Sequence, residues 1–281
     1  MVTGATNGIG RVAALQLAQR GATVAVVSRN AQRVADTVHD AQVAGAHMNV
    51  SGFTADLTSL SDTRVLAERL REHYPAIHGL INNAGGVFLA RKVTTEGLEE
   101  TWALNVVTPF LLTRLLEEPL RAAAAPEHWA RVVNVSSGAH MTARGLNWDD
   151  VGFARRYFGF AAYSHAKLAE VMLSLGQARA WRDRNISVNA LHPGFVNTGF
   201  GRESNRWLRL AFTLITPFAL SPEDGARTTL FAAASPEVEG LTGRYFEKER
   251  VARYNRVAAI EADQDRLLRL LEEQTGLKAE A

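Results

Sequence analysis

A glycine-rich turn at the start of the sequence constrains the fold more than any other feature. The segment Thr3–Gly10 reads Thr-Gly-Ala-Thr-Asn-Gly-Ile-Gly and lies between a short apolar run and a helical pattern. Glycines at such a junction let the backbone turn tightly and approach a pyrophosphate, and the free N–H groups of the following helix attract its negative charge. The segment therefore predicts a nucleotide-binding turn, although a plain structural turn explains this motif equally well when it is taken alone.

Short β-branched runs alternate with longer helical patterns along the whole chain. This alternation is typical of a parallel sheet covered on both faces, so it predicts an α/β, doubly wound Rossmann fold of about seven strands, in one domain over residues 1–281. The expected strands are Thr23–Ser28, Met48–Phe53, Gly79–Asn82, Arg131–Ser136, Ile186–Leu191 and Gly243–Phe246. The expected helices are Gly10–Arg20, Ala31–Ala44, Leu60–His73, Leu98–Leu116, Ala162–Arg182, Glu223–Ala234 and Ile260–Glu273.

The end of the second expected strand indicates which nucleotide the chain binds, because this position of a Rossmann fold contacts the adenosine ribose. Ser28, Arg29 and Asn30 stand there, Arg33 follows one helical turn later, and no acidic residue is present. An acid would bind the ribose 2′-hydroxyl and repel a 2′-phosphate, whereas a guanidinium offers forked donors to a phosphate. We predict NADP(H) as the preferred cofactor. The alternatives are NAD(H) and, for the two arginines, solvated charges at a helix start.

Tyr163 and Lys167 form the most informative pair of side chains. Their spacing of four places them one turn apart on the same face of a helix. A phenol with a pKa near 10 is a poor base at neutral pH, but a neighbouring ammonium lowers the pKa of a phenol. Such a phenol can give a proton to a developing alkoxide or take one from an alcohol. A surface pair is the alternative, since this spacing also occurs by chance.

Taken in order, these motifs resemble the short-chain dehydrogenase/reductase family, and the resemblance runs from Val2 to about Tyr245. It implies an oxidoreductase that moves a hydride between a nicotinamide and an alcohol or carbonyl. Its implied catalytic residues are Asn105, Ser137, Tyr163 and Lys167. Strand alternation lets only one of Ser136 and Ser137 face the pocket, and Ser137 is preferred because the family pattern matches the second serine. Asn105 would hold a water against Lys167, or be a buried amide, or both.

The resemblance also assigns cofactor contacts near the ends of the strands. Asp56 would lie against the adenine, with a helix-start acid as the alternative, and the Asn82–Gly85 segment would border the cofactor. His192 is expected to be structural. The implied cofactor-binding residues are Gly4, Thr6, Asn7, Gly8, Ile9, Gly10, Ser28, Arg29, Asn30, Arg33, Asp56, Leu57, Asn83, Ala84, Gly85, Tyr163, Lys167, Pro193, Gly194, Val196 and Thr198.

Finer features resemble the retinol dehydrogenase-like branch of this family, which often reduces lipophilic aldehydes or ketones with NADPH. The segments Arg131–His140, Ser164–Ala169 and Leu241–Phe246 carry this likeness. Substrate loops are expected at about 138–162 and 197–221, and a C-terminal helical extension at about 255–275. Apolar residues within Phe200–Leu220 suit a lipophilic pocket, with an oligomer contact or ordinary core as the alternative.

The amino-acid composition limits the classes of protein to which this chain can belong. Hydrophobic residues make up 47% of the 281, which is typical of a globular protein. The absence of cysteine excludes disulfides and thiolate zinc sites, and the histidines show no metal-ligand spacing, so no metal is expected. A net charge of +2 without a basic tract gives no reason to expect nucleic acid as a partner. With no apolar run of membrane-spanning length and no secretory signal, we expect a cytoplasmic protein without an integral membrane segment.

Two further expectations concern the chain as a whole. Only three residues precede Gly4, so the central first strand is short, and we expect the natural start to lie upstream or the domain to be less stable. The resemblance implies a homodimer or homotetramer that acts on a small-molecule alcohol or carbonyl. The alternative function is a non-catalytic NADP(H)-sensing regulator on the same fold. Such proteins usually lose the tyrosine or the lysine, and this chain retains both.

Overall fold

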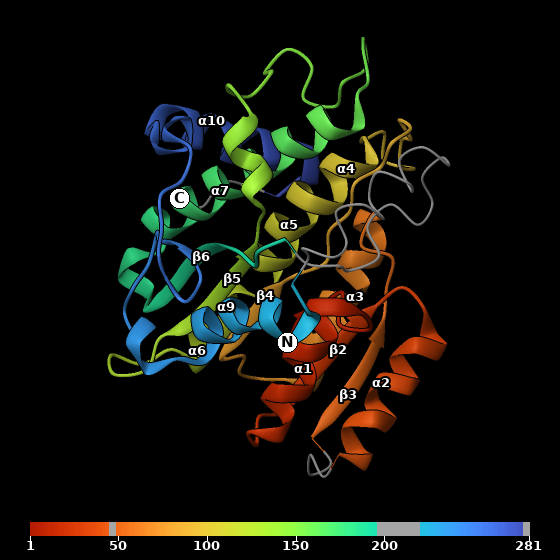
Figure 1. Cartoon of the computed structure of the whole chain (residues 1–281), viewed down its shortest axis with the longest axis vertical. Helices are drawn as coiled ribbons and strands as arrows, with labels where there is room; N and C mark the ends of the chain where they lie inside the picture. Colours follow the sequence, from red (N-terminus) through yellow and green to blue (C-terminus); the bar gives the residue numbers. More distant parts are fainter. Residues whose placement is uncertain (45–48, 196–219, 278–281) are drawn as a thin grey trace.

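The computed structural model describes residues 1–44, 49–195 and 220–277. Within them, eight strands form one sheet in the order β3-β2-β1-β4-β5-β6-β7-β8 (Figure 1). All neighbouring pairs are parallel except β7 and β8. The strands are β1 Val2–Thr3, β2 Val24–Ser28, β3 Val50–Thr54, β4 Gly79–Asn82, β5 Ala130–Val135, β6 Ile186–His192, β7 Tyr245–Glu247 and β8 Arg250–Val251. This order is that of a doubly wound Rossmann sheet and confirms the expected fold class.

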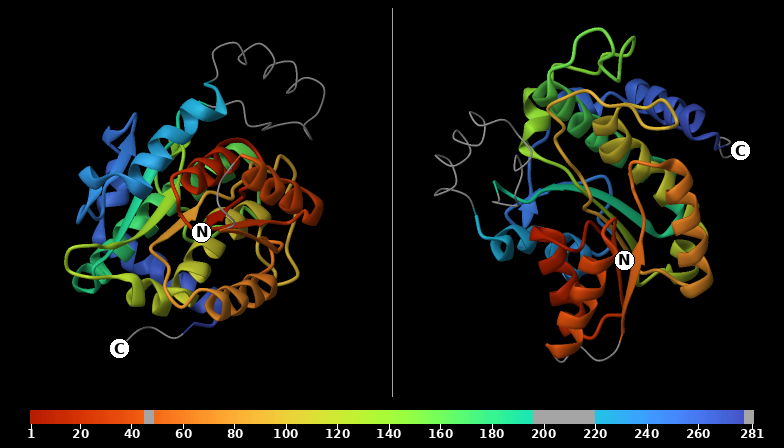
Figure 2. Two further views of the ribbon diagram at one scale, coloured as in Figure 1. Left: turned by 90° about the horizontal axis from the view of Figure 1, so that it is seen from below. Right: turned by 90° about the vertical axis from the view of Figure 1, so that its right-hand side faces the viewer.

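Helices cover both faces of the sheet (Figure 2). One face carries α1 Gly8–Gln19, α2 Ala31–Val43 and α9 Pro222–Ala234, and the other carries α3 Leu60–His73, α5 Thr108–Leu115 and α7 Gly159–Ala180. Outside α5 and α7 lies α10 Glu261–Thr275, the expected C-terminal extension. The remaining short elements are α4 Glu100–Trp102, η1 Ala103–Val107, α6 Glu117–Ala123, η2 Gly138–Thr142, η3 Arg182–Arg184, η5 Pro236–Val238 and η6 Arg256–Ala259.

The core follows from alternation along the strands. In β2, Val24 and Val26 pack under α1 and α2, whereas Ala25 and Val27 pack under α3 and α5. Successive side chains of a strand point to opposite faces, so a strand that is covered on both sides is apolar at every position. Leu267 and Leu271 of α10 are fully buried against α5 and α7, which adds a third layer on that side.

Side-chain caps start the helices near the nucleotide end. Asn7 accepts a hydrogen bond from the Gly8 N–H at the start of α1, and Asn30 accepts one from the Arg33 N–H at the start of α2. Asparagine is among the preferred residues for this position because its side-chain oxygen satisfies an orphan backbone donor. Both helices therefore begin directly after the strand ends, and their N-termini face the carboxyl edge of the sheet.

The helix expected over Leu98–Leu116 is wrong in detail, because a π-helical turn, η1, separates α4 from α5. Pro109 explains why the helix widens into a π turn at this point. Its nitrogen cannot donate to the carbonyl of Asn105 four residues earlier, and its ring collides with that carbonyl in a regular α-helix. A local π turn relieves the collision, and π turns are frequent at functional sites. Pro109 was the sequence signal for this interruption.

The sheet has one more strand than the approximate seven expected, because β8 turns back along β7. Lys248 and Glu249 form the turn between them in the left-handed region, with φ of 51° and 59°. Asparagine and glycine usually occupy such turns, so the sequence carries no hairpin signal here. The other elements shift by a few residues at their ends. The largest of these shifts is at the start of α7, which begins at Gly159, three residues before the expected Ala162.

Candidate active site at the carboxyl edge of the sheet

The parallel strands all end at the same edge of the sheet, where ligands bind in this fold. Thr3 joins the first turn to the segment after β4. Its hydroxyl accepts hydrogen bonds from the N–H groups of Asn83 and Ala84, at 2.9 and 3.0 Å. The Asn83 side chain in turn donates to the Thr3 carbonyl at 2.8 Å. These bonds place the glycine-rich turn and the Asn82–Gly85 segment side by side at the switch between β1 and β4.

The glycine-rich turn has a conformation that requires glycine. Gly4 and Gly8 have φ of 63° and 50°, which other residues rarely adopt. At Gly10, a Cβ would lie 2.3 Å from Asn83 Nδ2 and 2.5 Å from the Gly4 carbonyl oxygen. Side chains are thus excluded where the backbone turns into α1, whose first N–H groups have no intrahelical acceptor. This arrangement fits the pyrophosphate of a dinucleotide.

The ends of β2 and β3 carry the residues expected near the adenosine. Thr6 donates to the Ser28 hydroxyl at 2.9 Å, and Arg29 and Arg33 are exposed. Neither arginine forms an ion pair within residues 1–44, 49–195 and 220–277, so both guanidinium groups are available to an anion. Asp56 accepts from the Thr58 N–H and hydroxyl at 2.9 and 2.8 Å, in the turn that precedes the N-cap Ser59 of α3. Leu57 is buried, and its carbonyl accepts from Thr108.

Tyr163 and Lys167 lie on one face of α7, as their spacing predicts, and both are buried. The Lys167 Nζ lies 5.8 Å from the centroid of the Tyr163 ring. It donates to the Val135 carbonyl at 2.9 Å and to Oε2 of Glu170 at 2.8 Å. The ammonium is therefore fixed between the end of β5 and the aromatic ring, and a chance surface pair is excluded.

Asn105 and Lys167 converge on the backbone of Gly85. A Cβ at Gly85 would lie 2.8 Å from Asn105 Oδ1 and 3.4 Å from Lys167 Nζ. The Asn105 amide donates to the carbonyls of Gly86 and Thr101, at 3.0 and 2.8 Å, and accepts from the Gly86 N–H at 3.3 Å. The buried amide is thus satisfied on backbone, as one of the two sequence interpretations expected. The π turn places it beside the lysine.

The two serines after β5 have different surroundings. Ser136 is buried and donates to the Lys167 carbonyl at 3.1 Å, which ties the strand to α7. Ser137 is half-buried and accepts from the Ala139 N–H at 3.2 Å, as the N-cap of η2. Accepting that bond leaves the Ser137 O–H able to donate to a ligand. The geometry therefore favours the second serine.

The comparisons with known proteins agree with this arrangement. A family model described as short chain dehydrogenase matches residues 1–209. The chain belongs to this family. Human polyprenol dehydrogenase is 34% identical over 253 residues, which cover 89% of this chain and 76% of that protein. Mouse retinol dehydrogenase 12 is 34% identical over 88% of this chain and 76% of its own length.

Among solved structures, the Pseudomonas aeruginosa RhlG/NADP active-site complex is 28% identical, with a TM-score of 0.70 and coverage of 87% of this chain and 92% of that one. As a member of the short-chain dehydrogenase family, this protein is therefore an oxidoreductase that acts on alcohol or carbonyl groups with a nicotinamide cofactor. In its described residues, no helix is both long enough and apolar enough to cross a bilayer.

Glu170 is a buried residue of the site that the sequence interpretation missed. Its side chain is almost completely inaccessible, and it forms the ion pair with Lys167. Burial raises the pKa of Glu170 from its usual value to about 7, although the neighbouring ammonium acts in the opposite direction. A signal was present, because a spacing of three places an acid on the same helix face as the lysine. A glutamate at that spacing is more often a solvated surface residue.

Two histidines beside the site have structural roles. His192 accepts a hydrogen bond from the Gly138 N–H at 3.1 Å, and burial lowers its pKa. His140 lies against Tyr245, with ring centroids 4.8 Å apart, and its Nδ1 lies 2.6 Å from the Ser137 carbonyl oxygen. Burial also lowers the pKa of His140. These contacts join η2 to the end of β6 through His192 and to β7 through His140.

The expected loop at 138–162 is partly helical and is anchored on both sides. Its first residues form η2 and its last residues begin α7. Tyr157 donates to the Phe88 carbonyl at 2.8 Å, and His165 accepts from the Asn147 N–H at 2.8 Å. Pro193 and Gly194 follow β6, with Gly194 at φ 90°. Val196, Thr198 and nearly all of the second expected loop lie outside the described residues.

His165 should make this enzyme sensitive to acid. Its ring is buried and accepts a hydrogen bond, and burial lowers its pKa from 6.5 to about 4. The unfolded chain therefore binds a proton at a higher pH than the folded chain, so stability is full above 6.5 and falls as pH drops toward 4. The gap corresponds to about 3 kcal/mol. Urea unfolding across this pH window measures it.

His165→Gln should remove most of that acid-dependent loss, because glutamine can accept from the Asn147 N–H without titrating in this range. The exposed His39 provides a matched control, and His39→Gln should leave the pH dependence unchanged. Equal acid sensitivity of His165→Gln and the unmodified protein would contradict the assignment.

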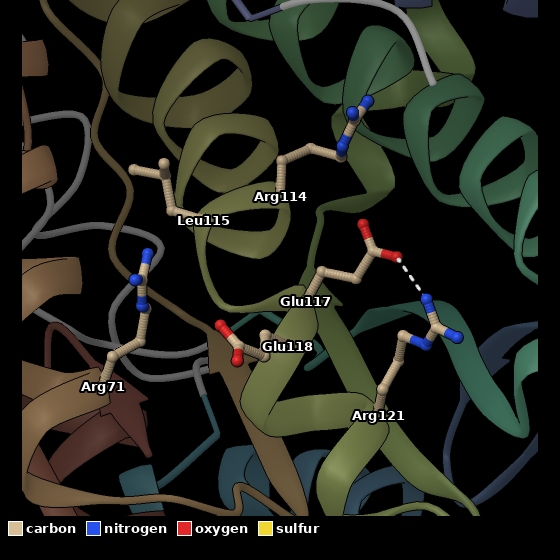
Figure 3. A pocket seen from close by; sticks show the side chains of 6 residues that line it. All are labelled: Arg71, Arg114, Leu115, Glu117, Glu118 and Arg121. Carbon is tan, nitrogen blue, oxygen red and sulfur yellow. Dashed lines mark ion pairs between the residues drawn. The ribbon is translucent and has the colours of Figure 1, made fainter. Parts of the chain in front are cut away.

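A surface pocket lies at the opposite edge of the sheet, between α3, α5 and α6 (Figure 3). Its lining residues are Arg71, Arg114, Leu115, Glu117, Glu118 and Arg121. Arg114 pairs with Glu272 at 3.3 Å, and Glu117 pairs with Arg121 at 4.0 Å and with Arg184. These charges neutralise one another far from Tyr163, so we place the chemistry at the carboxyl edge.

Proposed function

We propose that the enzyme interconverts a lipophilic alcohol and the corresponding aldehyde or ketone, with NADP(H) as the preferred cofactor. The observation that carries this proposal is the convergence of Tyr163, Lys167 and Asn105 beside Gly85, next to the glycine-rich turn. A structural protein has no need for a buried ammonium held against a tyrosine ring. A non-catalytic sensor would need the nucleotide turn but not this pair.

In the proposed mechanism, Tyr163 is the general acid and base. During reduction its hydroxyl gives a proton to the carbonyl oxygen, and during oxidation its phenolate takes the alcohol proton. The Ser137 hydroxyl donates to the same substrate oxygen and stabilises the charge that develops on it. Lys167 favours the anionic form of the phenol, and its ammonium is held by the Val135 carbonyl and by Glu170. When bound, the nicotinamide cofactor supplies or accepts the hydride.

The residues that would hold the cofactor follow β1, β2 and β4 at the carboxyl edge of the sheet. The turn that contains Gly4, Gly8 and Gly10 would bind the pyrophosphate through backbone N–H groups at the start of α1. The Asn83–Gly85 backbone would border the nucleotide, and Arg29 and Arg33 would bind a 2′-phosphate. Support for NADP comes from these two available guanidinium groups. The similar RhlG structure, which is a complex with NADP, adds support.

Arg29→Asp should weaken NADPH binding much more than NADH binding. A hydrogen-bonded contact between charged groups contributes about 1.5–3 kcal/mol, which corresponds to roughly a tenfold to hundredfold change in affinity. Titration of the protein with each reduced nucleotide, followed by nucleotide fluorescence, gives both dissociation constants. Arg20→Asp, at the far end of α1, is the matched control and should change neither. Equal weakening of both nucleotides in Arg29→Asp would refute the 2′-phosphate assignment.

Apolar side chains around the site support a lipophilic substrate. Leu89, Met141, Phe158 and Phe160 are exposed although they are large and hydrophobic. Gly159 lies directly against the Phe88 and Leu89 backbone, so the apolar start of α7 and the segment after β4 adjoin each other one turn before Tyr163. The names of the similar proteins, polyprenol dehydrogenase and retinol dehydrogenase, point to the same class of substrate.

The direct test is oxidation of NADPH in the presence of a panel of aliphatic, aromatic, retinoid and steroid carbonyls. We expect turnover that increases with the apolar surface of the substrate. Turnover of small polar carbonyls only would refute the lipophilic class. NADPH binding without turnover of any carbonyl would instead favour the sensor.

A further inference from the structure

We propose that Glu170 is a positioning residue that holds the catalytic lysine and reduces the positive charge that Tyr163 experiences. This inference rests on the proposed function, because it assigns Tyr163 and Lys167 the proton transfer. It adds a carboxylate to the four residues that the family resemblance implies.

The geometry gives Glu170 control over the position of the ammonium. A lysine ammonium has three donors, and two of them are bound here, to the Val135 carbonyl and to Oε2 of Glu170. The side chains of Lys167 and Glu170 are 4% and 1% exposed, so water cannot replace either bond. The third donor is left for the side of Gly85 and Tyr163. A lysine held this way cannot swing away from the tyrosine when the site is empty.

The backbone keeps the carboxylate in place. The Ser174 hydroxyl donates to the Glu170 carbonyl at 2.7 Å, and the Asn134 side chain donates to that hydroxyl at 2.8 Å, which fixes this turn of α7 to β5. Oε1 of Glu170 is buried and has no hydrogen-bond partner among the described residues. An orphaned buried carboxylate oxygen is costly.

The charge of Glu170 opposes that of Lys167. Interactions between charges are strong in a buried site because the effective dielectric constant is low. An ionised Glu170 therefore offsets part of the field by which the ammonium favours a phenolate at Tyr163. A neutral Glu170 leaves the full charge of the ammonium acting on the tyrosine. The protonation state of Glu170 thus regulates the acid strength of the catalytic group.

Several groups from neighbouring elements bear on this carboxyl. Lys167 and Tyr163 share its helix, the Ser136 hydroxyl lies at the end of β5, and Tyr245 comes from β7. His140 of η2 contacts Tyr245, and Glu247 of β7 acts on both of them. Burial raises the pKa of Glu170 to about 7 in these surroundings.

Ultraviolet titration of tyrosinate tests the inference without any ligand. The chain has five tyrosines, and subtraction of the Tyr163→Phe titration from that of the unmodified protein isolates Tyr163. The same subtraction is made in the Glu170→Gln background, with Glu170→Gln/Tyr163→Phe as the reference. We expect the Tyr163 midpoint to fall by about one pH unit when the carboxylate is removed. A merely structural role of Glu170 would not move this midpoint.

Glu99→Gln is the matched control, because Glu99 is also a buried carboxylate but caps α4 and binds Tyr157. It should cost stability and leave the midpoint unchanged. If Glu170→Gln does not fold, Glu170→Asp replaces it. Its carboxylate is withdrawn from Nζ by one methylene, so it should lower the midpoint in the same direction by less.

An unchanged Tyr163 midpoint in the folded variants would overturn this inference, whatever the enzyme turns over. A different result would refute the proposed function, namely carbonyl turnover that does not depend on Tyr163. A lowered midpoint together with a shift of the pH profile of alcohol oxidation to lower pH would support both.

Discussion

Tyr163→Phe should reduce carbonyl reduction by roughly a hundredfold to ten-thousandfold, the range that a general acid or base contributes. The phenyl ring retains the packing of a side chain that is 8% exposed and lies on Lys167, but no proton can pass to the substrate oxygen. NADPH binding should change little, because the glycine-rich turn and the arginines after β2 are untouched. Steady-state kinetics with the best carbonyl of the panel, together with nucleotide titration, measures both quantities.

Tyr74→Phe is the matched control, since Tyr74 follows α3 at the opposite edge of the sheet. It should leave kcat and KM unchanged. Full activity of Tyr163→Phe would remove the tyrosine from the mechanism. Loss of NADPH binding in that variant would mean that the hydroxyl holds the cofactor and not the proton.

Lys167→Met should abolish activity and also destabilise the fold. Removal of the ammonium leaves Glu170 buried without its partner, and breaking a buried pair on one side typically costs about 3–5 kcal/mol. The ammonium lowers the pKa of Glu170, so its removal raises that pKa further and keeps the carboxyl protonated to a higher pH. The loss of stability should therefore grow as pH rises, because an ionised Glu170 would then have to be buried without a partner. Urea unfolding over a series of pH values measures this dependence.

The double variant Lys167→Met/Glu170→Leu distinguishes stability from catalysis. Replacement of a buried pair by apolar residues of similar size is often neutral or stabilising, so the double variant should recover most of the lost stability. It should remain inactive, since no ammonium faces Tyr163. If Lys167→Met unfolds as the unmodified protein does at every pH, the ion pair is not buried in solution. Recovery of activity in the double variant would exclude a catalytic role for the lysine.

Much of the site could be predicted because its spacing is local. The glycines of the first turn, the caps at Asn7 and Asn30, and the four-residue interval between Tyr163 and Lys167 each depend on a few neighbouring residues. The parallel sheet followed from the alternation of β-branched and helical runs. Because all strands of a parallel sheet end at the same edge, the residues that follow them lie close together there.

Other features were wrong or missed where the deciding contact is distant. The π turn at Asn105 is the exception, because its cause, Pro109, is only four residues away. In contrast, β8 forms only because β7 offers it an edge and because Lys248 and Glu249 adopt positive φ. The difference between Ser136 and Ser137 became clear only from the Lys167 carbonyl, which is 31 residues from Ser136.

By itself, the sequence determined the fold class, the nucleotide-binding turn and the pair Tyr163 and Lys167, because backbone geometry sets which residues share a turn or a helix face. The tertiary structure decided what surrounds that pair. Asn105, Gly85 and Lys167 come from three separate elements, and only the packing of α7 between the sheet and α10 buries Glu170 against the lysine. Burial depends on contacts between distant segments, which helix spacing alone does not reveal, and it is burial that makes Glu170 a partner of Lys167 and raises its pKa.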